Sequence, residues 1–306
     1  MARTDALSIY TDSSTRDKLA EIQGYVIEAV QKGAVSERMK NTDYSGDPSA
    51  GSIEIDRFKN ATVDDYGTAR TAGAGKKILN TGKVTININE DKEIVEEIAK
   101  KDVNLYGIPS IMDRRKANQA LRMIADLDTR FFTQMVTDGT EITGLTTETP
   151  LVDNLETIIQ SIETTQNDWV DGVDREMIEL SVKPAIYGQL LNYIDSVPNP
   201  ISGLNEDVFH KVKIYSNHRQ TKDIICAIHG AVGQPVTIDE YEPEKIPFSN
   251  NYDCSLFYSR GTKSIMPDLI RYADITTPEP PEPEPELEPD PEVEQGGGET
   301  GDENGN

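Results

Sequence analysis

The residue types that most often bind metal ions are few in this chain and are not spaced as ligands. His210, His218 and His229 show no H-E-x-x-H spacing, and Cys226 and Cys254 form no C-x-x-C pair. We expect His229 at the end of a strand, the other two histidines in loops, and both cysteines as reduced thiols. The sequence therefore predicts no metal site and no cofactor.

A glycine-rich segment with two lysines, residues 73–77, partly matches a phosphate-binding loop. That loop requires G-x-x-x-x-G-K-[ST], but Arg70 stands in place of the first glycine and Lys77 in place of the hydroxyl residue. The segment also precedes an expected strand, whereas a phosphate loop precedes a helix. We interpret it as the flexible tip of a hairpin that carries Arg70, Lys76 and Lys77. Two roles stay open for these cations: solvated charge, or contact with an acidic face of a neighbouring molecule.

Acidic residues are abundant, so their spacing alone indicates little. With 54 Asp and Glu residues, close pairs such as Asp64-Asp65 and Glu96-Glu97 arise by chance, and we expect them to be surface charge. The G-x-S-x-G motif of many hydrolases is missing from the sequence. We therefore predict no catalytic residue and expect a protein that is not an enzyme.

Charge and composition restrict the possible partners. The formal net charge is −24, and residues 276–306 hold eleven acidic and no basic side chains, which leaves 43 acidic against 30 basic residues elsewhere. Such a chain is repelled by nucleic acid. The proline- and glutamate-rich segment 276–306 is expected to be disordered. No run of 18 apolar residues and no apolar region near the first residue are present, so we expect neither a membrane span nor a secretory signal.

The first third of the sequence predicts a helix and a long hairpin. Apolar residues recur at helical spacing over 12–32, and residues 41–51 have loop composition. Residues 52–56 and 83–89 each alternate apolar and polar side chains, as half-buried strands do, on either side of a glycine-rich stretch. Two strands alone cannot bury both faces. The hairpin over 51–89 therefore needs a partner surface, either its own body or another subunit.

The middle of the sequence predicts the dominant helix, roughly 110–137. It would be about 40 Å long at 1.5 Å per residue. Ser110 and Asp113 resemble a capping pair, and Gly139 is expected to end the helix. A shorter helix is expected over 91–101, with Ile94, Val95 and Ile98 facing inward. The apolar stripe of the long helix is expected to comprise Ala117, Leu121, Ile124, Phe131 or Phe132, and Met135.

The remaining pattern mixes helices and strands, so the fold class is α+β. Helices are expected over 153–166, capped by Asp153 and Glu156, and over 184–195. Strands are expected over 177–182, 211–215, 223–229, 235–238 and 255–258, and the apolar pattern ends near Ile275.

In its order of segments the chain resembles the major capsid proteins of tailed bacteriophages, which have the Hong Kong 97 fold. Residues 51–56 through 81–89 resemble the extended E-loop of that family, and residues 118–132 resemble its spine helix. Residues 180–191 resemble a strand–helix step of the axial domain, and residues 223–233 and 260–270 resemble the C-terminal return. The resemblance covers about residues 1–275 and consists of segment order, without a signature motif.

The resemblance implies an organisation of the chain. It places an N-terminal arm at 1–50, the E-loop hairpin at 51–89 and a peripheral domain with the spine helix at 90–149. An axial domain follows at 150–235, a return to both domains at 236–275, and the acidic tail at 276–306. No fused scaffold is expected, because only about 50 residues precede the hairpin, and no covalent cross-link between subunits is assigned.

The resemblance also implies a function and partners. The chain would form pentamers and hexamers that close into an icosahedral shell around double-stranded DNA, without sequence-specific binding or a membrane. It would work with a separate scaffolding protein and a portal, assemble in the cytoplasm of a bacterial host and reside in the virion, with the acidic tail outside.

Three alternatives stay open. An encapsulin-like nanocompartment would share the fold but enclose enzymes instead of a genome. Another phage structural or scaffold-related protein would be more uniformly helical than this chain. A cytosolic α+β enzyme would need a site that the sequence does not offer.

Overall fold

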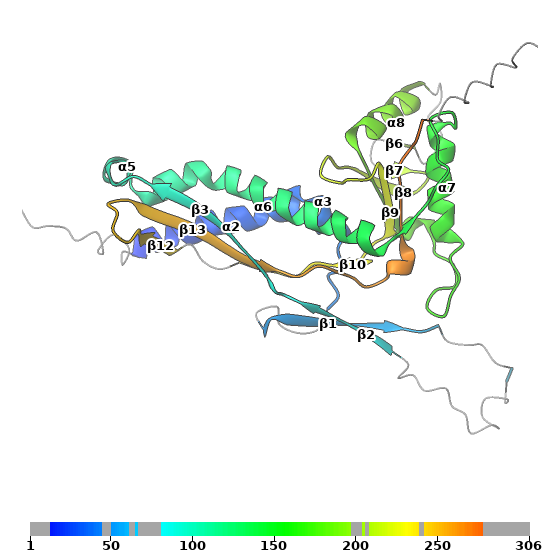
Figure 1. Cartoon of the computed structure of the whole chain (residues 1–306), viewed down its shortest axis with the longest axis horizontal. Helices are drawn as coiled ribbons and strands as arrows, with labels where there is room; N and C mark the ends of the chain where they lie inside the picture. The colour runs from blue at the N-terminus through cyan, green and yellow to red at the C-terminus, as the bar shows by residue number, and fades with distance from the viewer. Residues whose placement is uncertain are drawn as a thin grey trace, which may run out of the picture.

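The chain folds into an elongated α+β molecule with a long arm at one end and a compact sheet domain at the other (Figure 1). The structure is a computed structural model that describes residues 13–44, 50–60, 65–66, 81–196, 204–205, 208–238 and 242–277. Three clusters of buried apolar side chains hold it together: one around the large sheet, one along the arm, and a small one beneath the hairpin.

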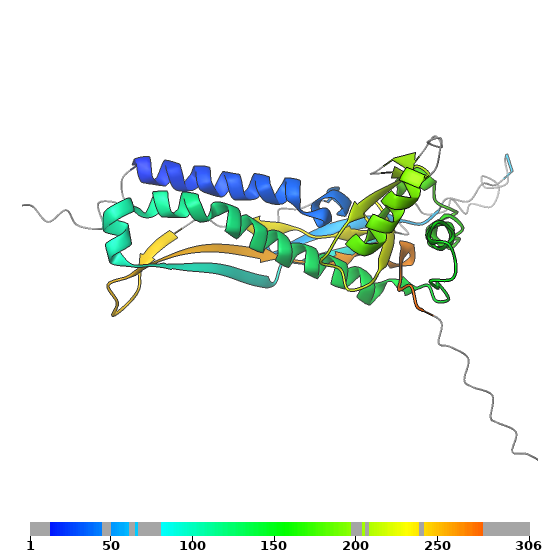
Figure 2. The ribbon, with the colours of Figure 1, turned by 90° about the horizontal axis from the view of Figure 1, so that it is seen from above.

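This long arm is a different part of the chain from the N-terminal arm expected over residues 1–50. It is built on helix α6, Ile108–Asp138, whose 31 residues make it about 46 Å long at 1.5 Å per residue. This confirms the expected spine helix. Figure 2 shows α6 lying between α2, Ser13–Gly33, and the paired strands β3, Glu90–Ile98, and β13, Tyr252–Arg260. The short helix α3, Val35–Met39, continues from α2. The N-terminal helix expected over 12–32 is therefore confirmed, with Leu19, Ile22, Val26 and Val30 buried as its period predicted.

The buried face of the spine differs from the expected one by a rotation. Ala117 is exposed and Leu121 is 57% exposed, whereas Ile124, Phe131, Phe132 and Met135 are buried as expected. The helix is covered on two sides, by α2 and by β13. The side chains that face these two elements are buried, and they are not the ones that the expected stripe contained. The buried residues missing from the expected stripe are Ile108, Met112, Gln119, Ala120, Met123, Leu127 and Asp128.

Neither expected capping pair forms. Helix α6 begins after Gly107, whose φ of 74° is one that glycine adopts readily, and Pro109 lies in its first turn. Ser110 and Asp113 therefore lie inside the helix. Helix α7, Leu151–Glu163, begins after Pro150, and Asp153 is likewise already helical. Gly139 does follow the last residue of α6, and its N–H binds the carbonyl of Met135 at 2.9 Å.

The prediction of a helix over 91–101 was wrong. Residues 90–98 form strand β3, which pairs antiparallel with β13 along all of its length, and the helix α5, Lys100–Tyr106, begins only afterwards. Ile94 and Ile98 are four residues apart, a spacing that places two side chains on one face of a helix and also of a strand. Pairing with β13 decides between the two, and leaves Val95 half exposed on the opposite face.

At the other end lies a seven-stranded sheet with the order β4-β15-β9-β5-β8-β7-β6. Strands β5 and β9 are buried at every position, as expected for central strands. Helices α7 and α8, Pro184–Ser196, pack against this sheet and confirm the two expected helices. Its strands are β4 Thr140–Glu141, β5 Ile178–Val182, β6 Leu204–Asn205, β7 Val208–Phe209, β8 Val212–Ser216, β9 Ile224–Ile228 and β15 Ile270–Ala273.

The remaining short elements lie along the arm and at its junction with the sheet. Strands β11, Val236–Ile238, and β12, Glu242–Lys245, pair with β13 on the side opposite β3. Strands β10, Val232–Gly233, and β14, Lys263–Ser264, pair at the junction between arm and sheet. Two single 3-10 turns, Arg175–Met177 and Pro267–Leu269, precede β5 and β15. Strands expected over 177–182, 211–215, 223–229, 235–238 and 255–258 are thus confirmed to within a few residues.

The hairpin has a described base and a tip outside the described residues. Strands β1, Ser52–Phe58, and β2, Thr81–Asn87, pair antiparallel as predicted. Ile53, Ile55 and Ile86 are buried against Ile265 of the body. The base is therefore satisfied within its own subunit, so the hairpin's need for a partner surface is met there by its own body. Arg70, Lys76 and Lys77 lie outside the described residues.

The structure describes only part of the expected disordered segment, 276–306, and only part of the expected loop, 41–51. The segment expected to be disordered, 276–306, is ordered at its start, because Thr276 donates its N–H to the carbonyl of Leu145 and bridges to Thr146. Residues 278–306 lie outside the described residues. Of the loop expected over 41–51, residues 45–49 also lie outside them.

Candidate subunit interface

The histidines and cysteines do not assemble into a reactive site. His210, in the turn between β7 and β8, places Nδ1 2.6 Å from Glu156, and His229, after β9, places Nδ1 3.4 Å from Glu179. Among the described residues, no three His, Cys, Asp or Glu side chains are grouped as metal ligands. His218 lies in the loop after β8.

The two thiols are buried in different cores. Cys226 lies in the sheet core and Cys254 in the arm core, and both are free. Burial raises the pKa of Cys254 to about 12 and raises that of Cys226 still further above its usual range. The thiolate is the nucleophilic form, so both side chains are inert.

The acidic pair Glu96-Glu97 is divided between the two faces of β3. Glu96 forms an ion pair with Arg115 at 2.8 Å, and Glu97 accepts a hydrogen bond from Asn251 at 2.7 Å. Neither has the shared environment that a general acid and base require. Asp65 is exposed, and Asp64 lies outside the described residues.

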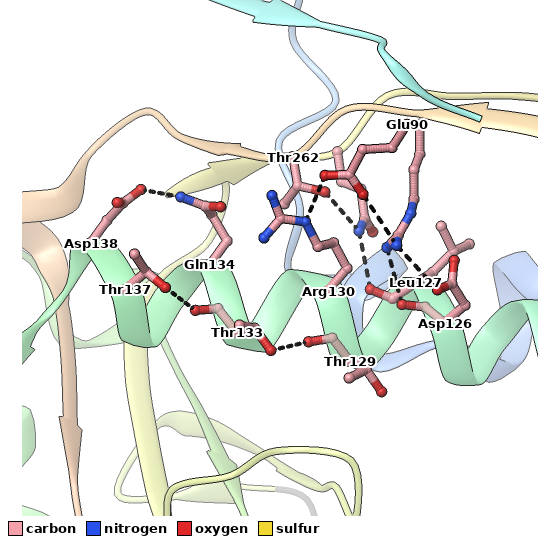
Figure 3. A network of polar contacts seen from close by, with 12 residues as sticks. Glu90, Asp126, Leu127, Thr129, Arg130, Thr133, Gln134, Thr137, Asp138 and Thr262 are labelled. Carbon is pink, nitrogen blue, oxygen red and sulfur yellow. Dashed lines mark hydrogen bonds and ion pairs between the residues drawn. The ribbon is translucent and has the colours of Figure 1, made fainter. Parts of the chain in front are cut away.

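The structural centre of the arm is a polar network that joins the spine to the strands beside it (Figure 3). Arg260 of β13, only 4% exposed, lies 3.1 Å from Asp126 and 3.2 Å from Glu90. Arg130 holds the same Glu90 at 2.8 Å, and Tyr258 donates to Asp126 at 2.8 Å. Burial, and then the hydrogen bond to Asp126, raise the pKa of Tyr258. These contacts tie β3, β13 and α6 into one rigid unit.

The spine is also fastened to the N-terminal helices by a buried carboxylate. Asp128 is fully buried and accepts hydrogen bonds from the N–H and hydroxyl of Ser36 at 2.9 and 2.7 Å. Arg219, from the loop after β8, approaches the other oxygen at 3.0 Å. One side chain thus connects α3, α6 and the sheet domain.

An exposed ladder of threonines follows the spine toward the sheet domain. Thr129, Thr133 and Thr137 each donate a hydroxyl hydrogen bond to the carbonyl four residues earlier, at 2.6 to 2.8 Å (Figure 3). Such bonds satisfy the side chains within the helix. This face of the spine therefore presents methyl groups to solvent without unsatisfied polar groups on these three side chains.

The hairpin base is fastened to the body by a latch around Trp169, which the sequence did not predict. Arg57 forms an ion pair with Asp268 at 2.6 Å and lies over the Trp169 ring at 4.9 Å. Lys59 lies over the same ring at 5.3 Å and binds Asp168 at 2.8 Å. The loop between α7 and β5 thereby sets the direction in which the ribbon leaves the body.

Neighbouring side chains favour the ionised form of Asp268, the carboxylate that binds Arg57 at the hairpin base. Burial alone would raise the pKa of Asp268, but hydrogen bonds from Arg57 and from Asn167 at 2.7 Å outweigh it and lower the pKa. The only sequence signal for this contact is the single tryptophan in a chain with few aromatic residues.

A second charged cluster braces the sheet domain. Arg175 binds Glu156 at 2.9 Å and Glu163 at 2.7 Å, and Glu156 also contacts His210. The hydrogen bond from Arg175 lowers the pKa of Glu163. For Glu156 burial opposes the shift, yet the bonds from Arg175 and His210 lower its pKa too. Glu156, expected to cap α7, instead joins this helix to the β7–β8 turn.

No helix in the described parts of the chain combines the length and the apolar character needed to cross a membrane. The described side chains thus provide a stiff, braced framework with exposed strands and loops. Such a framework can present surfaces to other molecules, and it holds no catalytic constellation.

Comparisons with known proteins agree with this architecture. No protein-family model matches the sequence, and no curated protein matches it. Among solved structures, the capsid of a native GTA particle is similar with a TM-score of 0.57 and 8% identity, over 81% of this chain and 90% of that chain. A virus-like particle from Pyrococcus furiosus gives a TM-score of 0.56 and 12% identity, over 83% and 98% of the two chains.

A phage structure is similar as well. The chain resembles one from Mycobacterium phage Che8 with a TM-score of 0.53 and 15% identity, over 73% of this chain and 84% of that chain. At identities this low the likeness concerns the fold, and it extends over most of each molecule.

Proposed function

We propose that this chain, whose fold is the Hong Kong 97 type expected from its segment order, is the major capsid protein of a tailed bacteriophage. The observation that supports the proposal most is the likeness in fold to the capsid of a native GTA particle, over 81% of this chain and 90% of that chain. In this proposal the protein is a structural building block of the virion and has no catalytic activity.

The physical basis of this function is geometry repeated many times. A closed shell needs subunits that keep their shape while each makes modest contacts with several neighbours. The network around Arg260 and the carboxylate of Asp128 give the spine that rigidity. We propose that copies form pentamers and hexamers of an icosahedral shell, with the spine in a peripheral domain and residues 150–235 in an axial domain.

The acidic character of the chain suits a container for DNA. A net charge of −24 disfavours tight binding of double-stranded DNA, so the shell would enclose the genome without sequence-specific contacts. A separate scaffolding protein and a portal are the further partners proposed, and assembly would take place in the cytoplasm of the bacterial host.

The hairpin is the element proposed to join neighbouring subunits. Its base is held by the Trp169 latch, so its direction is fixed before any neighbour is present. We propose that Arg70, Lys76 and Lys77 at the tip contact an acidic face of the next subunit. The excess of 54 acidic over 30 basic residues in the chain supports an acidic partner surface.

Removing the tip tests this function. We expect a variant in which residues 61–80 are replaced by a short Asn-Gly turn to fold normally but to form no shells, because β1 and β2 keep their contacts. Circular dichroism would report the fold, and electron microscopy and size-exclusion chromatography the particles.

The matched control is deletion of residues 281–300, which removes the same length of chain from the acidic tail and should leave shells intact. Normal shells from the 61–80 variant would contradict the role of the hairpin. If the unaltered chain formed only monomers or dimers under all assembly conditions, the capsid function itself would be refuted and a cytosolic enzyme favoured.

An encapsulin-like compartment is the alternative with the same fold, and a virus-like particle is among the similar structures. The comparisons do not support it better than a phage capsid. Particles purified from the native source distinguish the two, because a phage shell holds packaged DNA and a nanocompartment holds protein cargo.

A further inference from the structure

The most exposed apolar side chain of known placement lies at the far tip of the arm. Phe248, in the turn between β12 and β13, has a relative exposure of 112%, so its ring touches almost nothing of its own subunit. Its φ is 62°, a value that bulky residues rarely adopt. A conformation that strains the backbone and exposes an aromatic ring brings no benefit to an isolated subunit.

The turn that presents this ring is nevertheless well held. The N–H of Ile246 donates to the carbonyl of Asn251 at 3.1 Å, and that of Ser249 donates to the carbonyl of Ile246 at 3.1 Å. Asn251 also binds Glu97 of β3 at 2.7 Å. Phe248 is thus an aromatic knob on a fixed base.

A pocket of about 290 Å³ lies at the same end of the arm, where β3 ends and α5 and α6 meet. The apolar part of its lining consists of Ile98, Ile111 and Met112. Tyr106 also lines the pocket; its side chain is half exposed, and the guanidinium group of Arg114 lies 5.1 Å from the centre of its ring. An aromatic ring entering it would meet apolar side chains and a tyrosine edge. Phe248 of the same subunit does not line this pocket.

We propose that Phe248 of one copy inserts into this pocket of a neighbouring copy, and that this contact joins the arms of adjacent subunits around a closed ring. Knob and pocket occupy one end of one chain, connected through the Asn251–Glu97 hydrogen bond. A head-to-tail contact between two different patches closes into a ring when the rotation permits it.

The charges of the turn and of the pocket support a second copy of this chain as the partner that fills the pocket. The turn carries the exposed Lys245 three residues before Phe248. The pocket is lined by Glu96, Glu97 and Asp102 and by Arg114 and Arg115, of which Arg115 is paired with Glu96 at 2.8 Å, so its carboxylates outnumber its guanidinium groups by one. Opposite charges at a rim favour the correct register of two surfaces. This inference rests on the proposed assembly into shells and specifies one of its contacts.

The first test uses the substitution Phe248→Gly, which separates an effect on assembly from an effect on folding. Glycine accepts the positive φ, so the subunit is expected to melt at the same or a higher temperature, while the concentration needed for assembly rises at least tenfold. A purely structural role for Phe248 would give the opposite result, a lower melting temperature. Phe257→Gly, at another exposed phenylalanine in β13, is the matched control and should lower the melting temperature.

The second test identifies the contact itself. Subunits with Asn250→Cys, an exposed position in the same turn that leaves Phe248 in place, are co-assembled with subunits carrying Ala99→Cys in the pocket wall, and a short thiol-reactive bifunctional linker is added. The native cysteines are buried and give a low background. We expect a heterodimer of the two variants as the main cross-linked product.

Cross-linked homodimers of the Asn250→Cys chain as the only product, or no cross-linked product from intact particles, would overturn the proposal, since knob and pocket would then not meet. Failure of the capsid function looks different: the unaltered chain would give no particles. Shells that form from Phe248→Gly at the normal concentration would refute this contact and leave the capsid function standing.

Discussion

Asp128 illustrates how much of the framework depends on single buried charges. Its carboxylate satisfies Ser36 of α3 and Arg219 of the sheet domain at once, and it is inaccessible to water. This role could not be predicted from the sequence, because Asp128 follows an apolar residue in a helix rich in charge. Long-range pairing of this kind depends on packing and is invisible to local patterns.

We predict that Asp128→Asn lowers the free energy of unfolding of the subunit by roughly 2–4 kcal/mol, because it leaves Arg219 without its counter-charge. Urea denaturation followed by circular dichroism measures the effect. Glu176→Gln is the matched control, since its ion pair with Lys211 is exposed on both sides and should contribute less than about 0.5 kcal/mol. Equal effects of the two substitutions would show that Asp128 has no special role.

At the scale of elements, the sequence predicted the existence of the main helices and strands but not all of their boundaries. The spine, the N-terminal helix and the hairpin base were correct, because long apolar periods determine them. The strand β3 was missed because Ile94 and Ile98 suit both periods, and only β13, more than 150 residues later in the chain, selects the strand. The capping pair expected at the spine failed because Gly107 and Pro109 already determine where the spine starts, and the pair expected at α7 failed because that helix begins directly after Pro150.

The junction between hairpin and body depends on close backbone approach. A Cβ at Gly261 would collide with the carbonyl oxygen of Asn87, at the end of β2. Backbone on both sides leaves little room for adjustment. This contact also lay beyond the reach of the sequence, since Gly233 and Gly261, the glycines of the body that lie against the hairpin, are distant from it in the chain.

We predict that Gly261→Ala destabilises the subunit by about 1–3 kcal/mol, as overpacking does, and loosens the hairpin base. The matched control is Gly24→Ala in the exposed part of α2, where nothing lies within 4 Å of the added carbon. That change should stabilise the helix by about 0.5–1 kcal/mol. Thermal unfolding of both variants provides the comparison, and a loss of stability in Gly24→Ala would count against this explanation.

At the scale of the whole molecule, net charge opposes the gathering of many copies. Each chain carries −24, and eleven of its acidic residues lie in 276–306. Like charges repel over a distance of about 10 Å at 0.1 M salt and further in more dilute solutions. We therefore expect the charge of the tail to oppose the approach of subunits until other contacts outweigh the repulsion.

We predict that a chain ending at residue 277 assembles at lower salt than the full chain, with the largest difference below about 0.1 M, where screening is weak. Light scattering during a salt titration measures the onset of assembly for both chains. Identical titrations would show that the tail charge does not act on neighbouring subunits.

The latch at the hairpin base has one further consequence. Trp169 is the sole tryptophan of the chain, and its indole is flanked by Arg57 and Lys59 and by Gly82, whose lack of a side chain leaves room for the ring. Fluorescence excited at the indole band therefore comes from a single known place. Each subunit therefore carries an intrinsic optical probe at the base of its hairpin, and the emission wavelength is expected to follow the exposure of that base to water as copies come together.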